Sequence, residues 1–170
     1  MQPFRRSIHA VILGTVLLVA ARPAAAQLAK SVDVGLPFGP SGETGAAAFQ
    51  LGFRVASLKP QAPGVDFAIA TLPVAWAYGI AVVSSDLDLT YPVPLGGGVT
   101  LAPRAGASVL VAALFAPNEE GGAGAMPGYN VGLGLVGRTG PTSAIRADFT
   151  RRSFDGVAVS SVTIGFAWTP

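Results

Sequence analysis

The last stretch of the chain, residues 161–168, alternates without interruption between large apolar side chains and small or polar ones. Val162, Ile164, Phe166 and Trp168 fall on one face, and Thr163 is among those on the other. Successive side chains of a β-strand point to opposite sides, so this stretch has one apolar and one water-compatible face. The pattern is typical of a strand with lipid outside and a narrow lumen inside.

Residues 1–26 have the features of a secretory signal peptide. Arg5 and Arg6 form a basic start, residues 10–21 form an apolar run, and three alanines at 24–26 suit a cleavage site before Gln27. The apolar run is too short for a comfortable membrane span, although an uncleaved anchor helix is the alternative. The sequence therefore predicts a signal peptide at 1–26 and one exported domain at 27–170.

Composition excludes several chemistries for the exported chain. The chain has no cysteine, and its one histidine, His9, lies in the predicted signal peptide. Disulfides, thiolate nucleophiles, Ser–His pairs and histidine-ligated metal sites are therefore excluded. The formal charge of +2 owes much to Arg5, Arg6 and Arg22, and cleavage leaves about −1, so the charge gives no reason to expect nucleic-acid binding. We expect no catalytic, metal-binding or cofactor-binding residue and no cofactor.

Further alternating segments precede the last one and are separated by stretches rich in Gly and Pro. They cover residues 31–36, 48–58, 65–72, 80–91, 99–111, 129–136 and 145–150. With residues 161–168 they make eight strands of the length that barrel spans require. The sequence predicts an all-β fold, an eight-stranded antiparallel up-and-down transmembrane β-barrel. The segment 31–36 is the weakest, and Pro103 requires a bulge or an interruption of its strand.

The two faces of these segments differ in composition. The apolar face predicts lipid contact for Phe49, Phe53, Phe67, Leu133, Leu135, Phe149, Val162, Ile164, Phe166 and Trp168. The polar faces carry five Asp and five Arg, and the interior of an eight-stranded barrel has room for side chains only. Buried charges there must be paired. We therefore predict structural ion pairs in the lumen among Arg54, Asp66, Asp86, Asp88, Arg104, Arg138, Arg146, Asp148 and Arg152, with Asp33 also on the polar face.

Two other architectures compete with this interpretation. A soluble periplasmic β-barrel or sandwich that binds an apolar ligand would place the same charges in water. An inner-membrane helical protein could use residues 67–85, which carry no charge and are long enough to span a bilayer. Pro73 lies near the middle of that segment and Gly79 follows, which disfavours a helix.

Three motifs suggest chemistry, but a structural role explains each of them more simply. Residues 132–137 match G-x-G-x-x-G, yet residues 138–141 cannot open the helix that a dinucleotide site needs. Asp86 and Asp88 lie on one face, where pairing with Arg is expected in preference to acid–base catalysis or cation binding. Glu119 and Glu120 are expected at a solvated loop tip, with Ca²⁺ or a partner as the alternative.

The signal peptide, the Gly-rich strand 129–138, the strand 146–152 and the 162–168 ending together resemble small outer-membrane β-barrel proteins of the OmpA/OmpX type. The resemblance is one of pattern over most of residues 31–168. It implies outer-membrane localisation, contact with outer-membrane lipid, and periplasmic chaperones and the barrel-assembly machinery as partners during biogenesis. In that family a terminal strand ending in an aromatic residue is the assembly signal, whereas here Thr169 and Pro170 follow Trp168. The resemblance does not imply one activity, since members act as structural anchors, adhesins and occasionally lipid-modifying enzymes. Because the exported chain shows no histidine, cysteine or paired nucleophile, we expect a non-enzymatic structural or surface-interaction role, with the partner of the loops unidentified.

Overall fold

The protein is almost entirely strand in the computed structural model, which describes residues 28–39, 49–73, 75, 78–115 and 122–169. The strands are β1 (Leu28–Phe38), β2 (Gln50–Ser57), β3 (Gly64–Thr71), β4 (Ile80–Thr90), β5 (Val93–Gly96), β6 (Val99–Leu114), β7 (Ala123–Arg138), β8 (Ser143–Phe154) and β9 (Val157–Trp168). The predicted signal peptide lies outside the described residues and stays a prediction.

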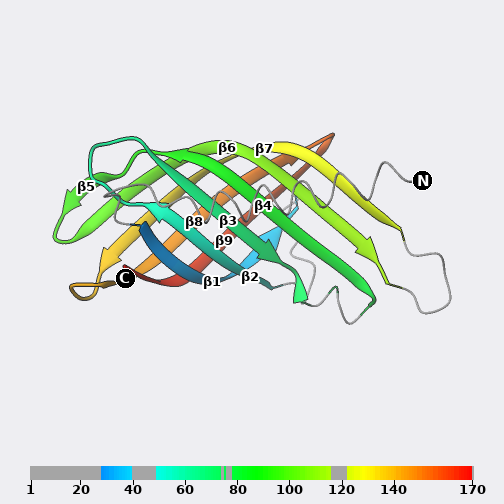
Figure 1. Cartoon of the computed structure of the whole chain (residues 1–170), viewed down its shortest axis with the longest axis horizontal. Coiled ribbons are helices and arrows are strands. Elements are labelled where there is room, and N and C mark those ends of the chain that lie inside the picture. Colours follow the sequence, from blue (N-terminus) through cyan, green and yellow to red (C-terminus); the bar gives the residue numbers. More distant parts are fainter. Residues whose placement is uncertain (1–27, 40–48, 74, 76–77, 116–121, 170) are drawn as a thin grey trace.

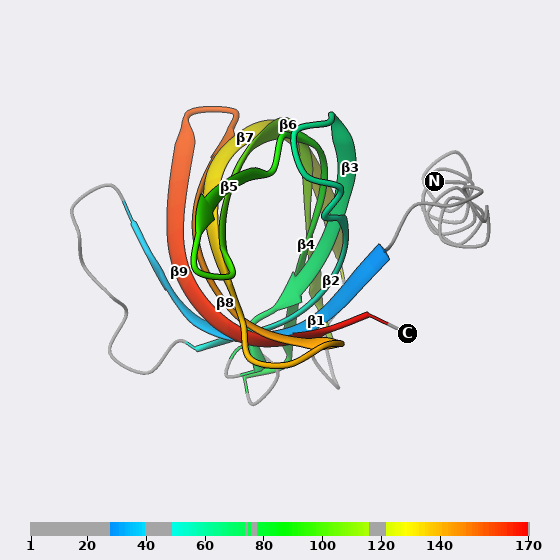
Figure 2. The ribbon, with the colours of Figure 1, turned by 90° about the vertical axis from the view of Figure 1, so that its left-hand side faces the viewer.

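Eight of these strands form a closed ring. The hydrogen-bonded order is β4-β3-β2-β1-β9-β8-β7-β6-β5, and an additional pairing of β4 with β6 joins the two sides of the sheet. Every pairing is antiparallel, and β1 meets β9 with Lys30 opposite Trp168. Figure 2 shows the ring from one end. The predicted fold class, an eight-stranded antiparallel up-and-down barrel, is confirmed.

The two ends of the barrel differ. One end, here called the turn end, carries the β2–β3 and β7–β8 connections, the short strand β5, the start of β1 and the end of β9 (Figure 1). The opposite end, the loop end, carries the tight turn Asp155–Gly156 between β8 and β9. The segments 40–48 and 116–121, which connect β1 to β2 and β6 to β7, lie outside the described residues.

Apolar side chains lie on the outside of the ring and charged side chains lie inside it. Along β8 buried and exposed residues alternate at almost every position, and the buried ones include Arg146, Asp148 and Arg152. Along β9 the exposed residues include Ile164 and Phe166. A water-soluble protein hides such apolar surface and exposes its charges. The faces of this barrel are therefore arranged for an apolar surrounding and a polar interior.

The uncharged segment 67–85 contributes strands and not a membrane helix. Residues 67–71 belong to β3 and residues 80–85 to β4, and these strands pair from Gly64 opposite Thr90 to Thr71 opposite Val83. The helical alternative for this segment is therefore wrong. In the described part of the chain, no helix is both long and apolar enough to cross a membrane.

Pro103 lies within the continuous strand β6 and causes no break. Its carbonyl accepts a hydrogen bond from the backbone N–H of Tyr91 at 3.1 Å. In a strand the nitrogen and the carbonyl of one residue point to the same side. The nitrogen of Pro103, which has no hydrogen to donate, therefore also faces the place where β4 ends and β5 begins. The β4 pairing ends at Arg104 and the β5 pairing starts at Leu101, so no ladder bond is lost there.

Two features of the fold go beyond the sequence prediction. The short strand β5 lies in the Pro- and Gly-rich stretch between the expected strands 80–91 and 99–111, and it pairs with the start of β6. The hairpin of β6 and β7 also continues to Ala113 opposite Ala123, whereas β8 ends where Phe154 pairs with Gly128. This part of the hairpin therefore extends past the neighbouring β8–β9 hairpin at the loop end.

Candidate functional site

The barrel interior contains most of the residues that the sequence marks as lumen ion pairs. Asp66, Asp86, Asp88, Arg54, Arg104, Arg146, Asp148 and Arg152 are all buried, with 5% or less of each residue exposed. They come from β2, β3, β4, β6 and β8, and all point toward the barrel axis. The interior is the candidate functional site because the charges gather there.

One group of ion pairs joins β2, β3, β6 and β8. Asp66 accepts hydrogen bonds from Arg54 Nη1 at 2.7 Å and from Arg146 Nη2 at 3.2 Å. Arg146 also donates to Asp148, with Nε at 2.6 Å from Oδ2 and Nη2 at 2.9 Å from Oδ1. Arg104 Nη1 donates to the same Asp148 carboxylate. Three guanidinium groups therefore bridge two carboxylates across the lumen.

A second group joins β4 to β6, β8 and β9. Arg152 donates to both Asp86 oxygens at distances of 2.7–3.1 Å, and its Nη1 donates to Ser161 Oγ at 3.1 Å. Ser108 Oγ donates to Asp86 Oδ1 at 2.7 Å. Forked guanidinium–carboxylate contacts of this kind are the strong form of ion pair.

Asn130 connects the two groups, and the sequence prediction did not assign it a role. Its Nδ2 donates to Asp88 Oδ1 at 2.7 Å and to Ser108 Oγ at 3.0 Å. Asp88 Oδ2 in turn lies 3.6 Å from Arg104 Nε. The alternating pattern places Asn130 on the inner face, and that position is the only sequence signal for its part in the network.

Arg138 departs from the prediction. It has the inward parity of β7, but it is exposed at the turn end and makes no ion pair with any described residue. It lies at the last position of β7. Among the described residues the interior therefore holds four buried Arg against five buried Asp, counting Asp33, whose Oδ2 lies 3.9 Å from Arg54 Nε.

Glycines on β7 make room for the long charged side chains. A Cβ at Gly134 would lie 2.7 Å from Asp148 Oδ1 and 3.0 Å from Arg146 Nη2. A Cβ at Gly132 would lie 2.8 Å from Arg104 Nε. The G-x-G-x-x-G spacing therefore serves side-chain packing, and a strand continues through it to Arg138 without the helix start that a dinucleotide site needs.

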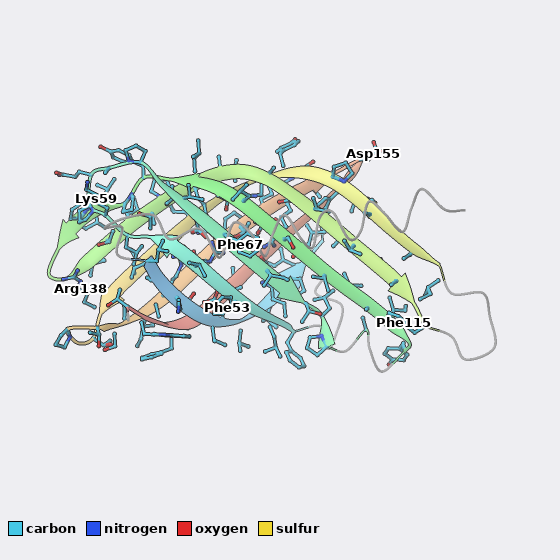
Figure 3. The ribbon with its side chains drawn as sticks, in the orientation of Figure 1. Phe53, Lys59, Phe67, Phe115, Arg138 and Asp155 are labelled. Carbon is cyan, nitrogen blue, oxygen red and sulfur yellow. The ribbon has the colours of Figure 1, made fainter. Side chains whose placement is uncertain are left out.

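The residues expected to face lipid lie on the outer surface. Exposed among them are Phe49, Phe53, Leu133, Leu135, Phe149, Val162, Ile164 and Phe166. Phe67 and Trp168 are half-buried, and Trp168 stacks on Phe166 with ring centroids 6.4 Å apart. Figure 3 shows Phe53 and Phe67 in the middle part of the barrel, away from both ends.

Asp86 and Asp88 are held by Arg152, Ser108 and Asn130, so they act as acceptors in the packed network. In the described ranges no group of three or more His, Cys, Asp or Glu could hold a metal ion. Glu119 and Glu120 lie outside the described residues.

Comparison with known proteins identifies the fold class. No protein-family model matches the chain, and no curated protein matches it in sequence. Among solved structures, Neisserial surface protein A has a TM-score of 0.68 at 10% identity, over 87% of this chain and 100% of that chain. Ail, the attachment invasion locus protein of Yersinia pestis, has a TM-score of 0.59 at 13% identity, over 83% and 95%.

A third similar structure is the outer membrane protein OprG from Pseudomonas aeruginosa. Its TM-score is 0.58 at 12% identity, over 84% of this chain and 95% of that chain. At such low identity the similarity concerns the fold. This chain has the fold of the small eight-stranded β-barrels found among outer-membrane proteins, which confirms the resemblance seen in the sequence.

Proposed function

We propose that this protein is a non-enzymatic outer-membrane β-barrel of a Gram-negative cell, with a structural or surface-interaction role. The observation that carries the proposal is the distribution of side chains. Ile164 is 62% exposed on the outer surface, whereas Asp66 is 0% exposed in the interior. Exposed aliphatic side chains around the whole ring suit hydrocarbon, and burial of so many charges is tolerated only where they pair.

The interior supports a closed barrel in place of an open pore. Side chains from β2, β3, β4, β6 and β8 meet across the axis through direct hydrogen bonds. An eight-stranded barrel has an interior just wide enough for side chains. The network would therefore act as a rigid polar core that holds the strands in register and leaves the loop end to present residues outward.

The ends of the barrel support a specific orientation. Outer-membrane barrels place short turns in the periplasm and longer loops outside the cell. We place the turn end, with Leu28 and Trp168, on the periplasmic side. Cleavage of residues 1–26 on export, escort by periplasmic chaperones and insertion by the barrel-assembly machinery through the 162–168 strand belong to the same proposal.

Cell fractionation together with a heat-modifiability gel tests the proposal. The mature chain should be recovered with the outer membrane and require detergent for release. Unheated samples should migrate as a compact band that shifts on boiling, because the paired barrel resists detergent until it is heated. Recovery in the soluble periplasmic fraction without detergent would exclude the proposal.

A further inference from the structure

The turn end of the barrel contains a cavity of about 410 Å³. Its floor is apolar and consists of the buried side chains of Val136, Ala144 and Ala167, with Leu58 packed against them. The β5 segment contributes Pro94 to its wall, and Figure 2 shows β5 lying at this end of the ring. A volume of this size matches small-molecule sites, which are commonly about 300–1,000 Å³.

The floor separates the cavity from the ion-paired interior. On β8 the inward residue after Ala144 is Arg146, which is 2% exposed and engaged with Asp66 and Asp148. A molecule in the cavity therefore meets methyl groups and not the lumen charges. The cavity is a compartment of its own at the barrel mouth.

Among the described residues that line the cavity, Arg138 is the one that carries a charge. It is exposed, and no described carboxylate lies within ion-pair distance of it. The hydroxyl residues Thr100, Thr142 and Ser143 also line the cavity. A guanidinium fork beside hydroxyl groups recognises carboxylates and phosphates by paired hydrogen bonds.

The charges around the turn end have one sign in the described part of the chain. Figure 3 shows Lys59 and Arg138 at this end and Asp155 at the opposite end. Every other described acidic residue is buried in the interior. A rim with cations and no described carboxylate raises the local concentration of anions and repels cations.

We propose that the turn-end mouth binds a small amphipathic anion. Its carboxylate or phosphate group pairs with Arg138, and its apolar body packs on the floor of Val136, Ala144 and Ala167. The inference goes beyond the proposed function, because it rests on the geometry of the mouth and not on where the barrel is located.

Titration of the isotopically labelled barrel in nanodiscs of zwitterionic phosphatidylcholine tests this inference. The probes are hexanoate and hexyl phosphate, with hexanol and hexylammonium as controls, and the readout is the amide chemical shift of each residue. The two anions should give saturable shifts clustered at Val136, Ala144 and Ala167. Hexanol and hexylammonium should bind at least about tenfold more weakly, since they lack the charge-assisted hydrogen bonds to Arg138.

Matched variants separate recognition from folding. Arg138→Gln should weaken hexanoate binding about tenfold or more while the remaining spectrum stays that of a folded barrel. Arg138→Lys should retain part of the affinity, since it keeps the charge and loses the fork. Arg151→Gln is the control, because Arg151 is an exposed arginine on the outer face of β8 away from the mouth, and it should bind hexanoate as the wild type does.

Three results would overturn the inference. These are equal binding of hexanol and hexanoate, unchanged affinity in Arg138→Gln, and shifts confined to the outer lipid-facing residues. A second titration, in discs that contain phosphatidylglycerol, identifies the source of the anion. Loss of hexanoate binding there assigns the site to a lipid headgroup, and unchanged binding assigns it to a soluble anion.

Discussion

Arg152 holds Asp86 with three hydrogen bonds of 2.7–3.1 Å, although the two residues lie 66 positions apart in the chain. Arg152 is on β8 and Asp86 on β4, and β7 and β6 lie between these strands in the ring. The pair therefore spans the lumen and connects walls that share no backbone hydrogen bond. Its loss should affect the whole barrel and not one hairpin.

We predict that Arg152→Met lowers the free energy of unfolding by about 3–5 kcal/mol, because it leaves the Asp86 carboxylate buried without its cation. The double variant Arg152→Met/Asp86→Leu should lose clearly less than the sum of the two single variants. Urea unfolding of the barrel in lipid vesicles, read by tryptophan fluorescence, measures all three. Additive effects would show that the two side chains are not coupled.

In the part of the chain that the structure describes, the interior carries five Asp and four Arg, and these carboxylates are not equally well paired. Asp148 accepts hydrogen bonds from Arg104 and Arg146. Asp88, in contrast, has only Asn130 within hydrogen-bond distance among the described side chains, and its Oδ2 lies 3.6 Å from Arg104 Nε. Asp88→Asn equalises the charges and should change the unfolding free energy by about 1 kcal/mol or less. Asp148→Asn should cost several kcal/mol because it removes the carboxylate that both Arg104 and Arg146 contact and leaves these buried guanidinium groups incompletely paired.

The temperature of the heat-modifiability transition compares these two variants on one gel. They are isosteric and exchange the same functional group, so each serves as the control of the other. A larger decrease in the transition temperature for Asp88→Asn than for Asp148→Asn would contradict the conclusion that Asp148 is the better paired of the two carboxylates.

The alternation of side chains was sufficient to predict the strands and the direction in which each face points. Residues 161–168 and 145–150 alternate large apolar with polar residues, and β9 and β8 contain them. Residues 112–114 and 123–128 are mostly Ala and Gly and lack this contrast. The sequence therefore does not indicate that the β6–β7 hairpin extends through them. The sequence pattern does not predict strand β5 either, because its Pro and Gly are residues typical of turns.

The partners of the lumen charges depend on strand register, which periodicity alone does not determine. Asp86 meets Arg152 because of the offset between β4, β6, β7 and β8. A shift of two residues in one of these pairings would keep every side chain on its face but change which residues meet across that pairing. Arg138 shows the complementary limit. Its parity is that of an inward residue, but it lies at the last position of β7, at the turn end, where its side chain is exposed.

The glycines of β7 give a prediction about packing around the network. A Cβ at Gly134 would contact Asp148 Oδ1 at 2.7 Å and Arg146 Nη2 at 3.0 Å, whereas nothing lies within 4 Å of a Cβ at Gly137. Gly134→Ala should lower the unfolding free energy by about 1–3 kcal/mol through overpacking. Gly137→Ala, three residues away on the same strand, should be close to neutral. Equal effects in urea unfolding would refute the role of Gly134 as a spacer.

The depth of an outward residue in the proposed membrane should determine how much a charge costs there. Ile164 is 62% exposed and lies near the middle of the wall, opposite Val34 and Ala147. Tyr129 is 66% exposed but lies close to the loop end, opposite Ser153. In a bilayer Ile164→Arg should cost about 2–4 kcal/mol and Tyr129→Arg about 0–1 kcal/mol.

The near-equal exposure of these two positions makes them a matched pair. In water neither arginine would meet a desolvation penalty, so a soluble barrel would tolerate both substitutions alike. Folding into phosphatidylcholine vesicles at a series of urea concentrations measures the difference directly. If Ile164→Arg lowered the free energy of unfolding no more than Tyr129→Arg does, hydrocarbon would not surround the middle of this wall. That result would exclude the proposed membrane location.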